Sequence, residues 1–322
     1  MTTTSTTTVA APAGGAAAPV RRARGRGGVR RHHPLTPYVL LAPYLILFVM
    51  FVAIPAVYGF WVSLHEWDFM LPNKPFIGMQ NYADLFDPDS VNGPGFWNGM
   101  RATAIFTVVS VPFLVLVPLG VALLLNRAFR GRAFFRAMIF APYVLGIAVV
   151  GLLFRYLLDS QFGLINWFIG LFGAPQIGWT QTQPWAWIGL VVMTVWWTQG
   201  FNAIIFLAAL QGIANDQYEA AAVDGAGKWS QFLYVTIPNL RNILVFIVTI
   251  SILASANMFG QAYLVTNGGP GDSTRTVIME MTQKGLRDFN MGSATAMSYV
   301  LAVVLAIVAV INFWALRERN VK

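Results

Sequence analysis

The sequence predicts an all-α, polytopic membrane protein with six transmembrane helices and both termini in the cytoplasm. Of its 322 residues, 57% are hydrophobic and only 11% are charged. The apolar residues fall in uncharged runs close to the roughly 20 residues that a helix needs to cross the hydrocarbon core. Lysine and arginine collect in alternate connections between these runs. Together these observations argue against a soluble globular protein.

The N-terminal segment, residues 1–34, differs in composition from the rest of the chain. Its first 31 residues hold six arginines and no acid, set among Thr, Ala, Gly and Pro. Such a composition cannot bury enough apolar surface to fold, so we expect a disordered cytoplasmic tail. No aromatic residue interleaves the arginines, which argues against nucleic-acid binding. The apolar run that follows is too long for a cleaved signal peptide. We therefore expect residues 35–322 to form the membrane domain.

Six apolar runs are expected to cross the membrane as helices. In chain order they are Tyr38–Trp61, Ala102–Leu125, Ala137–Phe154, Trp185–Leu210, Asn242–Thr266 and Met291–Leu316. The third run is the shortest, because Arg155 follows it after 18 uncharged residues. Its guanidinium would have to extend to the membrane surface. We expect the apolar piece Phe162–Phe172 to lie at the interface and not to span.

The direction of these spans follows from the basic residues, which favour cytoplasmic connections. With the N-terminus in the cytoplasm, 15 lysines and arginines lie on the cytoplasmic side and 6 on the other. The connection at 64–100, which carries five acids, then lies outside. The loop 214–241, between the fourth and fifth spans, is predicted to face the cytoplasm.

A GAGK sequence ending at Lys228 in this loop raises the question of a nucleotide site. A phosphate-binding loop of the Walker type needs a glycine five places before the Gly-Lys pair and a Ser or Thr after it. Those places hold Ala222 and Trp229. The chain has no cysteine and three histidines, which argues against a metal site. We therefore expect no catalytic residue, metal or cofactor in this chain.

The same loop is predicted to contain a short helix. Asp216, with Glu219 three residues later, is typical of a capping box, in which each side chain binds a free backbone amide at a helix start. The helix is expected to end near Val223. Gly225 and Gly227 can take the left-handed conformations that terminate a helix and turn the chain.

Two interpretations of this loop remain open on its spacing alone. The alanines at 220–222 leave the short helix nearly bare, which permits close docking of another surface. A second amphipathic segment follows, and Pro238 is expected to break it before the fifth span. Its apolar face is formed by Trp229, Phe232, Leu233 and Thr236. The loop is either an interfacial connector that packs on its own bundle or a docking site for a cytoplasmic partner.

The loop resembles the EAA loop of importer permeases of the ATP-binding-cassette superfamily. The residues that carry the resemblance are Glu219-Ala220-Ala221, Asp224-Gly225-Ala226, Phe232, Ile237-Pro238 and Leu240. The flanking residues are similar to the carbohydrate-uptake branch, as in maltose and glycerol-3-phosphate systems. They are Trp197, Gly200-Phe201-Asn202, Phe206 to Gln211 and Thr266 to Pro270. The resemblance covers roughly residues 35–320, with the motifs at 196–275.

The resemblance implies a coupling helix that docks on a separate ATPase, which binds the ATP and magnesium. It assigns this contact to Glu219, Ala220, Ala221, Asp224 and Gly225. It also implies a second permease subunit, an extracytoplasmic solute-binding protein and a multi-pass location in a prokaryotic cell membrane. Lys228 departs from the pattern, because small or polar residues are frequent at that place.

Polar side chains within the fourth and fifth spans are candidates for the solute path. Polar groups inside a span are costly unless they face a cavity or another helix, and amides and indole rings suit sugar hydroxyls and ring faces. The candidates are Trp196, Gln199 and Asn202 at steps of three, and Asn257 and Gln261 on one helical face. The alternative is that they pack helices together, as we expect for Ser251, Ser255, Ser298 and Asn312.

The function that these observations predict is import of a sugar or related polyhydroxylated solute by a non-catalytic permease subunit. A secondary transporter is the alternative. It would usually place an ionisable residue in mid-membrane or show an inverted repeat, and the sequence shows neither. A membrane enzyme would need converging acids, bases or metal ligands at one leaflet. The acids in the 64–100 loop are explained more simply as a solvated loop.

Overall fold

The computed structural model describes residues 36–316, so the expected tail at 1–34 lies outside the described residues. Within that range the secondary structure is helical, apart from isolated β-bridges that join His65 to Phe76 and Asp68 to Asn290. Five helices there are long and apolar enough to span a membrane, and a sharply bent helix pair supplies a sixth span if it is counted as one. The all-α membrane fold predicted from the sequence is confirmed.

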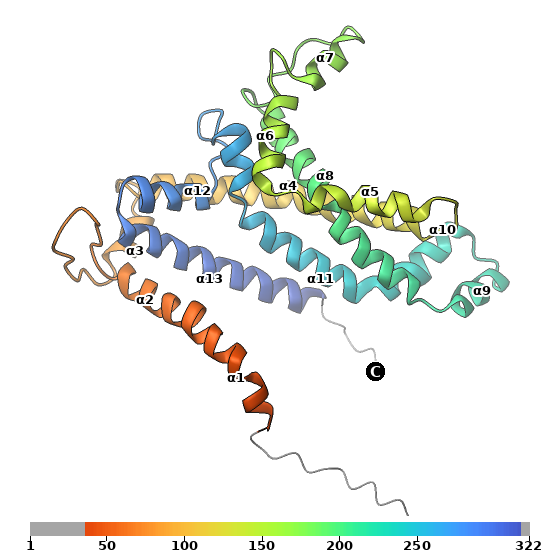
Figure 1. Cartoon of the computed structure of the whole chain (residues 1–322), viewed down its shortest axis with the longest axis horizontal. Helices are drawn as coiled ribbons and strands as arrows, with labels where there is room; N and C mark the ends of the chain where they lie inside the picture. Colours follow the sequence, from red (N-terminus) through yellow and green to blue (C-terminus); the bar gives the residue numbers. More distant parts are fainter. Residues whose placement is uncertain (1–35, 317–322) are drawn as a thin grey trace, which may run out of the picture. The chain divides into compact units, whose positions relative to one another are not determined.

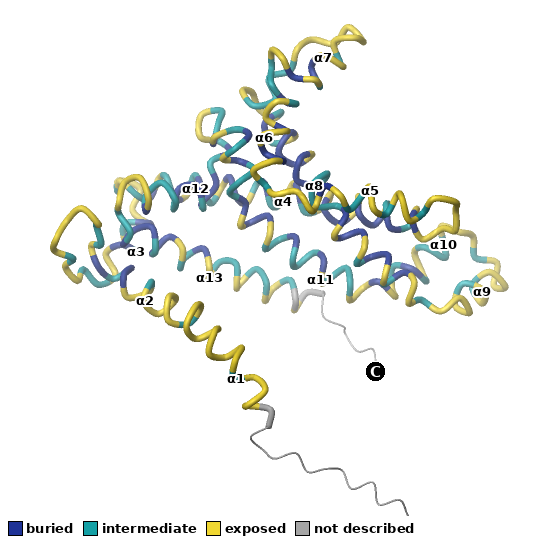
Figure 2. Tube along the Cα trace, viewed as in Figure 1, coloured by how far each residue is buried: buried dark blue, intermediate teal, exposed yellow. Residues whose placement is uncertain are grey.

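The chain divides into two units, Met1–Ile54 and Pro55–Lys322, and each is described by itself. In the first unit, helix α1 (Thr36–Phe48) continues into a π-helical turn, η1 (Val49–Ala53). Their side chains from residue 38 onward are almost all apolar and exposed (Figure 2). The candidate span runs from Tyr38 to Ser63, in agreement with the predicted Tyr38–Trp61. Such a helix needs lipid or another protein around it.

The second unit begins at Pro55, within α2 (Ile54–Ser63), and its core surrounds one long helix. Helix α4 (Gly93–Asn126) packs along α8 (Trp185–Gln211) and α11 (Ile237–Ala256), and α11 also packs on α13 (Met291–Leu316) (Figure 1). One core cluster gathers Leu119, Phe206 and Leu240 between α4, α8 and α11. Because lipid is as apolar as these side chains, the cluster stabilises the bundle by close van der Waals packing between the helices.

The predicted single span Ala137–Phe154 is wrong in shape. The segment forms two helices, α5 (Arg132–Val144) and α6 (Ile147–Leu157), which are bent by 97° relative to each other. Pro142 lies in the last turn of α5, and the next residues outside the helix, Leu145 and Gly146, are extended. Proline ends a helix because it has no N–H to donate. Uniform hydrophobicity across this break conceals it in the sequence.

The predicted fifth span, Asn242–Thr266, is displaced along the chain. The helix begins with α10 (Lys228–Gln231), passes through the π-turn η2 (Phe232–Thr236) and ends with α11 at Ala256. Pro238 does not break it, contrary to expectation. The wider π-turn directly before it accommodates a ring that clashes in a regular α-helix. Beyond the end, a separate π-turn, η3, covers Ala262–Thr266.

The connection after α6 contains α7 (Leu164–Gly170), which is too short to span, as expected for residues 162–172. The turn that leads into α7 is fixed by Asp159. Its carboxylate accepts hydrogen bonds from the N–H groups of Phe162 (2.9 Å) and Gln161 (2.8 Å). These bonds, the one from Phe162 first, hold the pKa of Asp159 below its usual range. The turn is thus formed by a charged side chain at neutral pH.

The two ends of the second unit carry different short elements (Figure 1). Helix α9 (Asn215–Val223) and α10 lie at one end, and α3 (Gln80–Phe86), α12 (Val277–Thr282) and η4 (Gln283–Arg287) lie toward the other. The arrangement places the candidate coupling loop and the 257–290 connection at opposite ends of α11.

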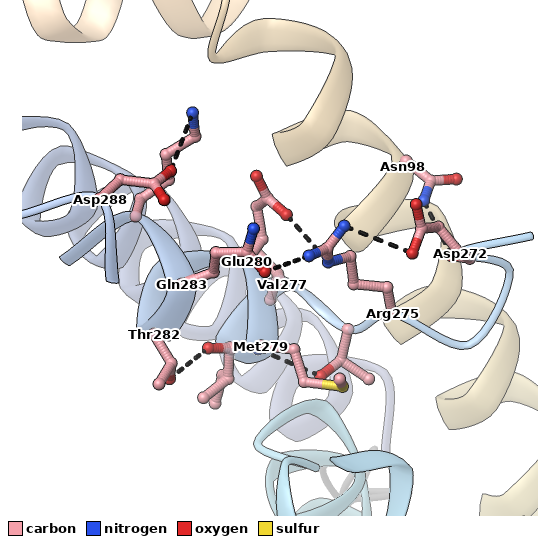
Figure 3. Close-up of polar contacts among 12 residues, drawn as sticks. Asn98, Asp272, Arg275, Val277, Met279, Glu280, Thr282, Gln283 and Asp288 are labelled. Atoms are coloured by element: carbon pink, nitrogen blue, oxygen red, sulfur yellow. Dashed lines mark hydrogen bonds and ion pairs between the residues drawn. The ribbon is translucent and has the colours of Figure 1, made fainter. Parts of the chain in front are cut away.

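A polar cluster holds α12 on the start of α4, as Figure 3 shows. Arg275 bridges Asp272 and the buried carboxylate of Glu280, each at 3.3 Å, and also donates to the Gln283 side chain. Asn98 donates to the Asp272 carbonyl at 2.9 Å. A buried carboxylate costs free energy unless it is paired, and here it is. The cluster therefore has a structural role.

Candidate functional site

The first candidate site is the short helix α9 with the turn that follows it. The turn has the hydrogen bonds of a Schellman motif: Gly225 N–H donates to Ala222 O (3.0 Å) and Ala226 N–H to Ala221 O (2.8 Å). Gly225 has a φ of +81°, so its predicted left-handed conformation is confirmed. Gly227 has a φ of −66° and begins α10 instead, so that part of the expectation is wrong.

The capping box expected at the start of α9 is also wrong. The N-cap position is Ala214, which offers no side-chain acceptor, and Asp216 lies inside the first turn. The helix starts earlier than the Asp-x-x-Glu spacing indicates. In this position the Asp216 carboxylate still faces the positive end of the helix dipole.

The surface of α9 is open, because none of its residues is buried. Among the residues predicted to contact an ATPase, Glu219, Ala220, Asp224 and Gly225 are exposed and Ala221 is half-buried. Val223 beside them is 88% exposed and Trp229 is 71% exposed. Large apolar side chains exposed next to carboxylates are typical of a surface that binds another protein.

The second candidate site is a cavity of about 440 Å³ between the spans. Helices α4, α5, α8 and α11 contribute to its walls, together with the residues that follow α11. The lining residues are Phe106, Leu114, Tyr143, Ile147, Thr194, Trp197, Thr198, Phe201, Asn202, Ile250, Ser251, Ala254, Ser255 and 257–261. No charged side chain is among them. Hydroxyls, amides and aromatic rings make up its chemically distinctive surface.

Three of the five predicted solute-path residues line this cavity, namely Asn202, Asn257 and Gln261. Trp196 and Gln199 do not. A helix turns about 100° per residue, so a step of three drifts by about 60° and carries Trp196 away from the face of Asn202. Trp196 packs instead against Phe154, with ring centroids 5.5 Å apart.

Asn257 and Gln261 reach the cavity for a reason other than the predicted one. They do not share a helical face, because α11 ends at Ala256 and helical backbone resumes only at Gly260. Asn257 Nδ2 donates to Leu253 O at 2.8 Å, and the same carbonyl also accepts from the Asn257 backbone N–H at the helix end. The Gln261 side chain makes no hydrogen bond within the described part of the chain. The break in the helix, with non-helical backbone, forms part of the cavity wall.

The remaining polar lining residues are held in place by the bundle. Asn202 is buried and donates to Leu114 O at 2.9 Å, which joins α8 to α4. Ser255 pairs with Ser110 at 3.0 Å between α11 and α4, which confirms the packing role expected for it. The amide oxygen of Asn202 and the hydroxyl of Ser255 nevertheless belong to residues of the cavity wall.

The sequence analysis missed the aromatic part of the wall. Tyr143 and Phe201 stack with centroids 5.1 Å apart, and Trp197 donates from Nε1 to Leu145 O at 3.0 Å. Thr194 and Thr198, four residues apart on α8, face the same cavity. The spacing 194, 198 and 201–202 was the available signal, because it marks one face of a helix with a mixture of hydroxyl, aromatic and amide groups.

A bundle of this kind, with an exposed helix at one end and an uncharged cavity among its spans, is the arrangement expected of a membrane-embedded transport subunit. Residues 102–319 match the family "Binding-protein-dependent transport system inner membrane component". The chain belongs to this family, and it is a permease subunit of an ATP-driven, binding-protein-dependent importer. Its relatives are transport subunits, which supports import by an ATP-binding-cassette system over ion-coupled transport.

Individual relatives extend over nearly the whole chain. The chain is 30% identical over 273 residues to the trehalose/maltose transport system permease protein MalF of Thermococcus litoralis, covering 84% of this chain and 91% of that protein. It is 32% identical over 304 residues to the lactose transport system permease protein LacF of Rhizobium radiobacter, covering 92% and 98%. It is 30% identical over 280 residues to the arabinooligosaccharides transport system permease protein AraP of Bacillus subtilis, covering 86% and 87%.

The fold is shared with a solved structure. A chain of a bacterial ABC transporter involved in the import of the acidic polysaccharide alginate superposes with a TM-score of 0.76 and 23% sequence identity. The match covers 89% of this chain and 96% of that chain. At this level of identity the likeness concerns the fold.

Proposed function

We propose that this permease translocates a neutral, polyhydroxylated solute, a sugar or short oligosaccharide, through the cavity between α4, α5, α8 and α11. The observation that carries the proposal is the chemistry of the wall. Its volume of about 440 Å³ lies in the range of about 300–1,000 Å³ common for small-molecule sites. Amide and hydroxyl groups can exchange hydrogen bonds with sugar hydroxyls, and the Trp197 and Tyr143 rings offer apolar faces. A charged solute would find no counter-charge among these residues.

Three of the relatives support the same class of solute. Their names assign to them trehalose and maltose, lactose and arabino-oligosaccharides, all of which are neutral and rich in hydroxyl groups. An uncharged wall fits this class. The family's dependence on a binding protein supports delivery of the solute by an extracytoplasmic solute-binding protein.

Coupling to ATP is proposed to occur through α9. We assign Glu219, Ala220, Ala221, Asp224 and Gly225 to the contact with a cytoplasmic ATPase that carries ATP and magnesium, in a complex completed by a second permease subunit. Support comes from the open surface of α9 and from its ordered C-terminal turn. The division of lysine and arginine, 15 to 6, supports a cytoplasmic position for this loop in a prokaryotic cell membrane.

Alanine variants of the cavity test the solute path. Gln261→Ala and Asn257→Ala each leave solute hydroxyls without a partner in a confined site, at about 1–3 kcal/mol. We expect roughly five- to hundredfold weaker apparent affinity at the membrane step. The measurement is uptake of radiolabelled maltose, trehalose, lactose and arabino-oligosaccharides by vesicles that hold the whole importer.

Gln199→Ala is the matched control, because Gln199 is an amide on α8 outside the cavity lining. It should leave uptake unchanged. If both cavity variants also transport every sugar at the parental rate, these side chains pack helices and do not bind solute. Uptake of a charged solute and of no sugar would contradict the proposed solute class.

A further inference from the structure

Helix α9 is attached to the long helix that follows it by two side-chain hydrogen bonds from adjacent residues. The Tyr218 hydroxyl lies 3.0 Å from Thr236 Oγ1, and Asn239 Nδ2 donates to Gln217 Oε1 at 2.7 Å. Both bonds cross from α9 to the region where η2 meets α11. Neither pair belongs to the surface assigned above to the ATPase contact.

The two bonds differ in their surroundings. Thr236 is 5% exposed and Tyr218 is half-buried, so this pair is shielded from competing water. Gln217 and Asn239 are exposed, but Asn239 is oriented by a second bond, from Nδ2 to Val235 O at 2.7 Å. A shielded hydrogen bond and an oriented one together fix both the distance and the rotation of α9 relative to η2.

These bonds matter because α9 has little else to hold it. It has no buried residue, and it meets the following helix mainly through α10 and η2, with the Asn239 side chain of α11 as a further contact. The turn at 224–227 is closed by Gln231 Nε2, which donates to Ala226 O at 3.1 Å. Without the bonds from Gln217 and Tyr218, the first half of α9 would be tied to α11 by no side-chain hydrogen bond within the described part of the chain.

The helix to which α9 is attached leads directly to the cavity. It runs without interruption from Lys228 to Ala256, 29 residues, which corresponds to about 43 Å at 1.5 Å per residue. At its far end Ser251, Ala254 and Ser255 line the cavity, and the chain then forms the non-helical part of the wall. One rigid element thus joins the docking helix to the cavity.

We propose that the Tyr218–Thr236 and Gln217–Asn239 pairs are the positioning contacts through which a displacement of α9 moves α11 and, with it, the wall of the cavity. These residues act through α11 and contact neither solute nor nucleotide. The proposal rests on the coupling role given to α9 above. In this arrangement α10, η2 and α11 move together as one continuous helix, and the four side chains attach α9 to that helix.

The absence of cysteine from the chain allows a test that needs no known solute. Ala254→Cys places one thiol on the exposed part of the cavity wall. The importer is purified with its ATPase through a tag on this chain, and the rate of labelling by a maleimide is measured with and without ATP, magnesium and vanadate. In the parent we expect trapped nucleotide to change this rate several-fold.

The double variant Tyr218→Phe/Asn239→Ala should retain the ATPase and hydrolyse ATP while the labelling rate no longer responds to nucleotide. Tyr218→Phe alone, which keeps the ring, should show an intermediate response. Gln217→Glu and Thr236→Ser keep an acceptor or hydroxyl in place and should respond as the parent does.

Tyr234→Phe is the matched control, because Tyr234 lies on the same π-turn, is 78% exposed and makes no hydrogen bond through its hydroxyl in the described structure. A parental response of the double variant overturns the proposal. Loss of the ATPase from the double variant overturns it too, because the four residues would then support docking and not transmission. If the parent itself binds no ATPase, the proposed function fails instead.

Discussion

At the scale of single residues, the most specific feature of the coupling helix is Gly225. Its φ of +81° lies in the region that L-residues avoid, and a Cβ added there would meet no atom within 4 Å. The cost of a side chain is therefore conformational and not steric, about 1–2 kcal/mol. The same chain supplies its control, because Gly227 also has open space around it but has an ordinary φ of −66°.

We expect Gly225→Ala to weaken the Schellman turn and to lower uptake, with the amount of protein in the membrane unchanged. Gly225→Asn should lose less uptake than Gly225→Ala, because Asn tolerates the left-handed region. Gly227→Ala should transport as the parent does. Uptake and membrane abundance of the three variants are measured side by side, and equal transport by Gly225→Ala and Gly227→Ala would show that the turn is not required for coupling.

At the scale of elements, the approach of α5 to α8 depends on Gly200. A Cβ on this residue would lie 2.5 Å from Ile139 O and 2.7 Å from Phe140 Cα, both of which are backbone atoms of α5. Backbone cannot move aside as the end of a flexible side chain can. The contact between α5 and α8 therefore requires a glycine, and α5 carries Tyr143 of the cavity wall.

We predict that Gly200→Ala destabilises the detergent-solubilised protein by about 1–3 kcal/mol, as overpacking does. Gly120→Ala is the control, because Gly120 is also a glycine inside a span but has no atom within 4 Å of the added Cβ. Thermal unfolding followed by tryptophan fluorescence measures both. Unchanged stability of Gly200→Ala would mean that α5 shifts freely on α8.

The same scale shows what hydropathy can and cannot predict. Met291–Leu316 was predicted with both of its bounds, because polar or charged residues flank a run that the structure keeps as one helix. The fifth span was displaced, because hydropathy does not register a polar helix start at Lys228 or a helix end capped by the Asn257 side chain. The bend between α5 and α6 depends on Pro142 and two extended residues inside an apolar run, which averaging over a window conceals.

The candidate sites were predictable to different degrees for the same reason. The open surface of α9 follows from local composition, because alanine and glycine carry too little side chain to shield the helix backbone. The cavity depends on which faces of α4, α5, α8 and α11 meet, and this is a property of packing. Its three amides, Asn202, Asn257 and Gln261, were among the predicted residues, but Trp196 and Gln199 were wrongly included with them. Tyr143, Trp197 and Phe201 were not distinguished from aromatic residues that face lipid.

At the scale of the whole molecule, the distribution of charge predicts the orientation in the membrane. Asp89 lies in the 64–100 connection and Val223 on α9, and both are exposed. In intact cells we expect Asp89→Cys to react with an impermeant maleimide and Val223→Cys to react only after the membrane is opened. Because the parent has no cysteine, it serves as the control for background labelling. If Val223→Cys is labelled in intact cells and Asp89→Cys is not, the orientation in the membrane is the reverse of the predicted one.

The end of α11 at Ala256 has a consequence for water in the membrane. Ser255 contacts Ser110, which lies halfway along α4, so the non-helical segment 257–259 begins near the middle of the longest helix of the second unit. Hydrocarbon offers no partner to free backbone amides and carbonyls, and such backbone is stable only within protein or against water. Protein satisfies part of this segment, because Asn257 N–H donates to Leu253 O, Met258 N–H donates to Ser255 O, and Met258 O accepts from Thr276 Oγ1. Backbone groups of the segment without a protein partner require water, so the break in the helix favours a cavity that holds water and not lipid.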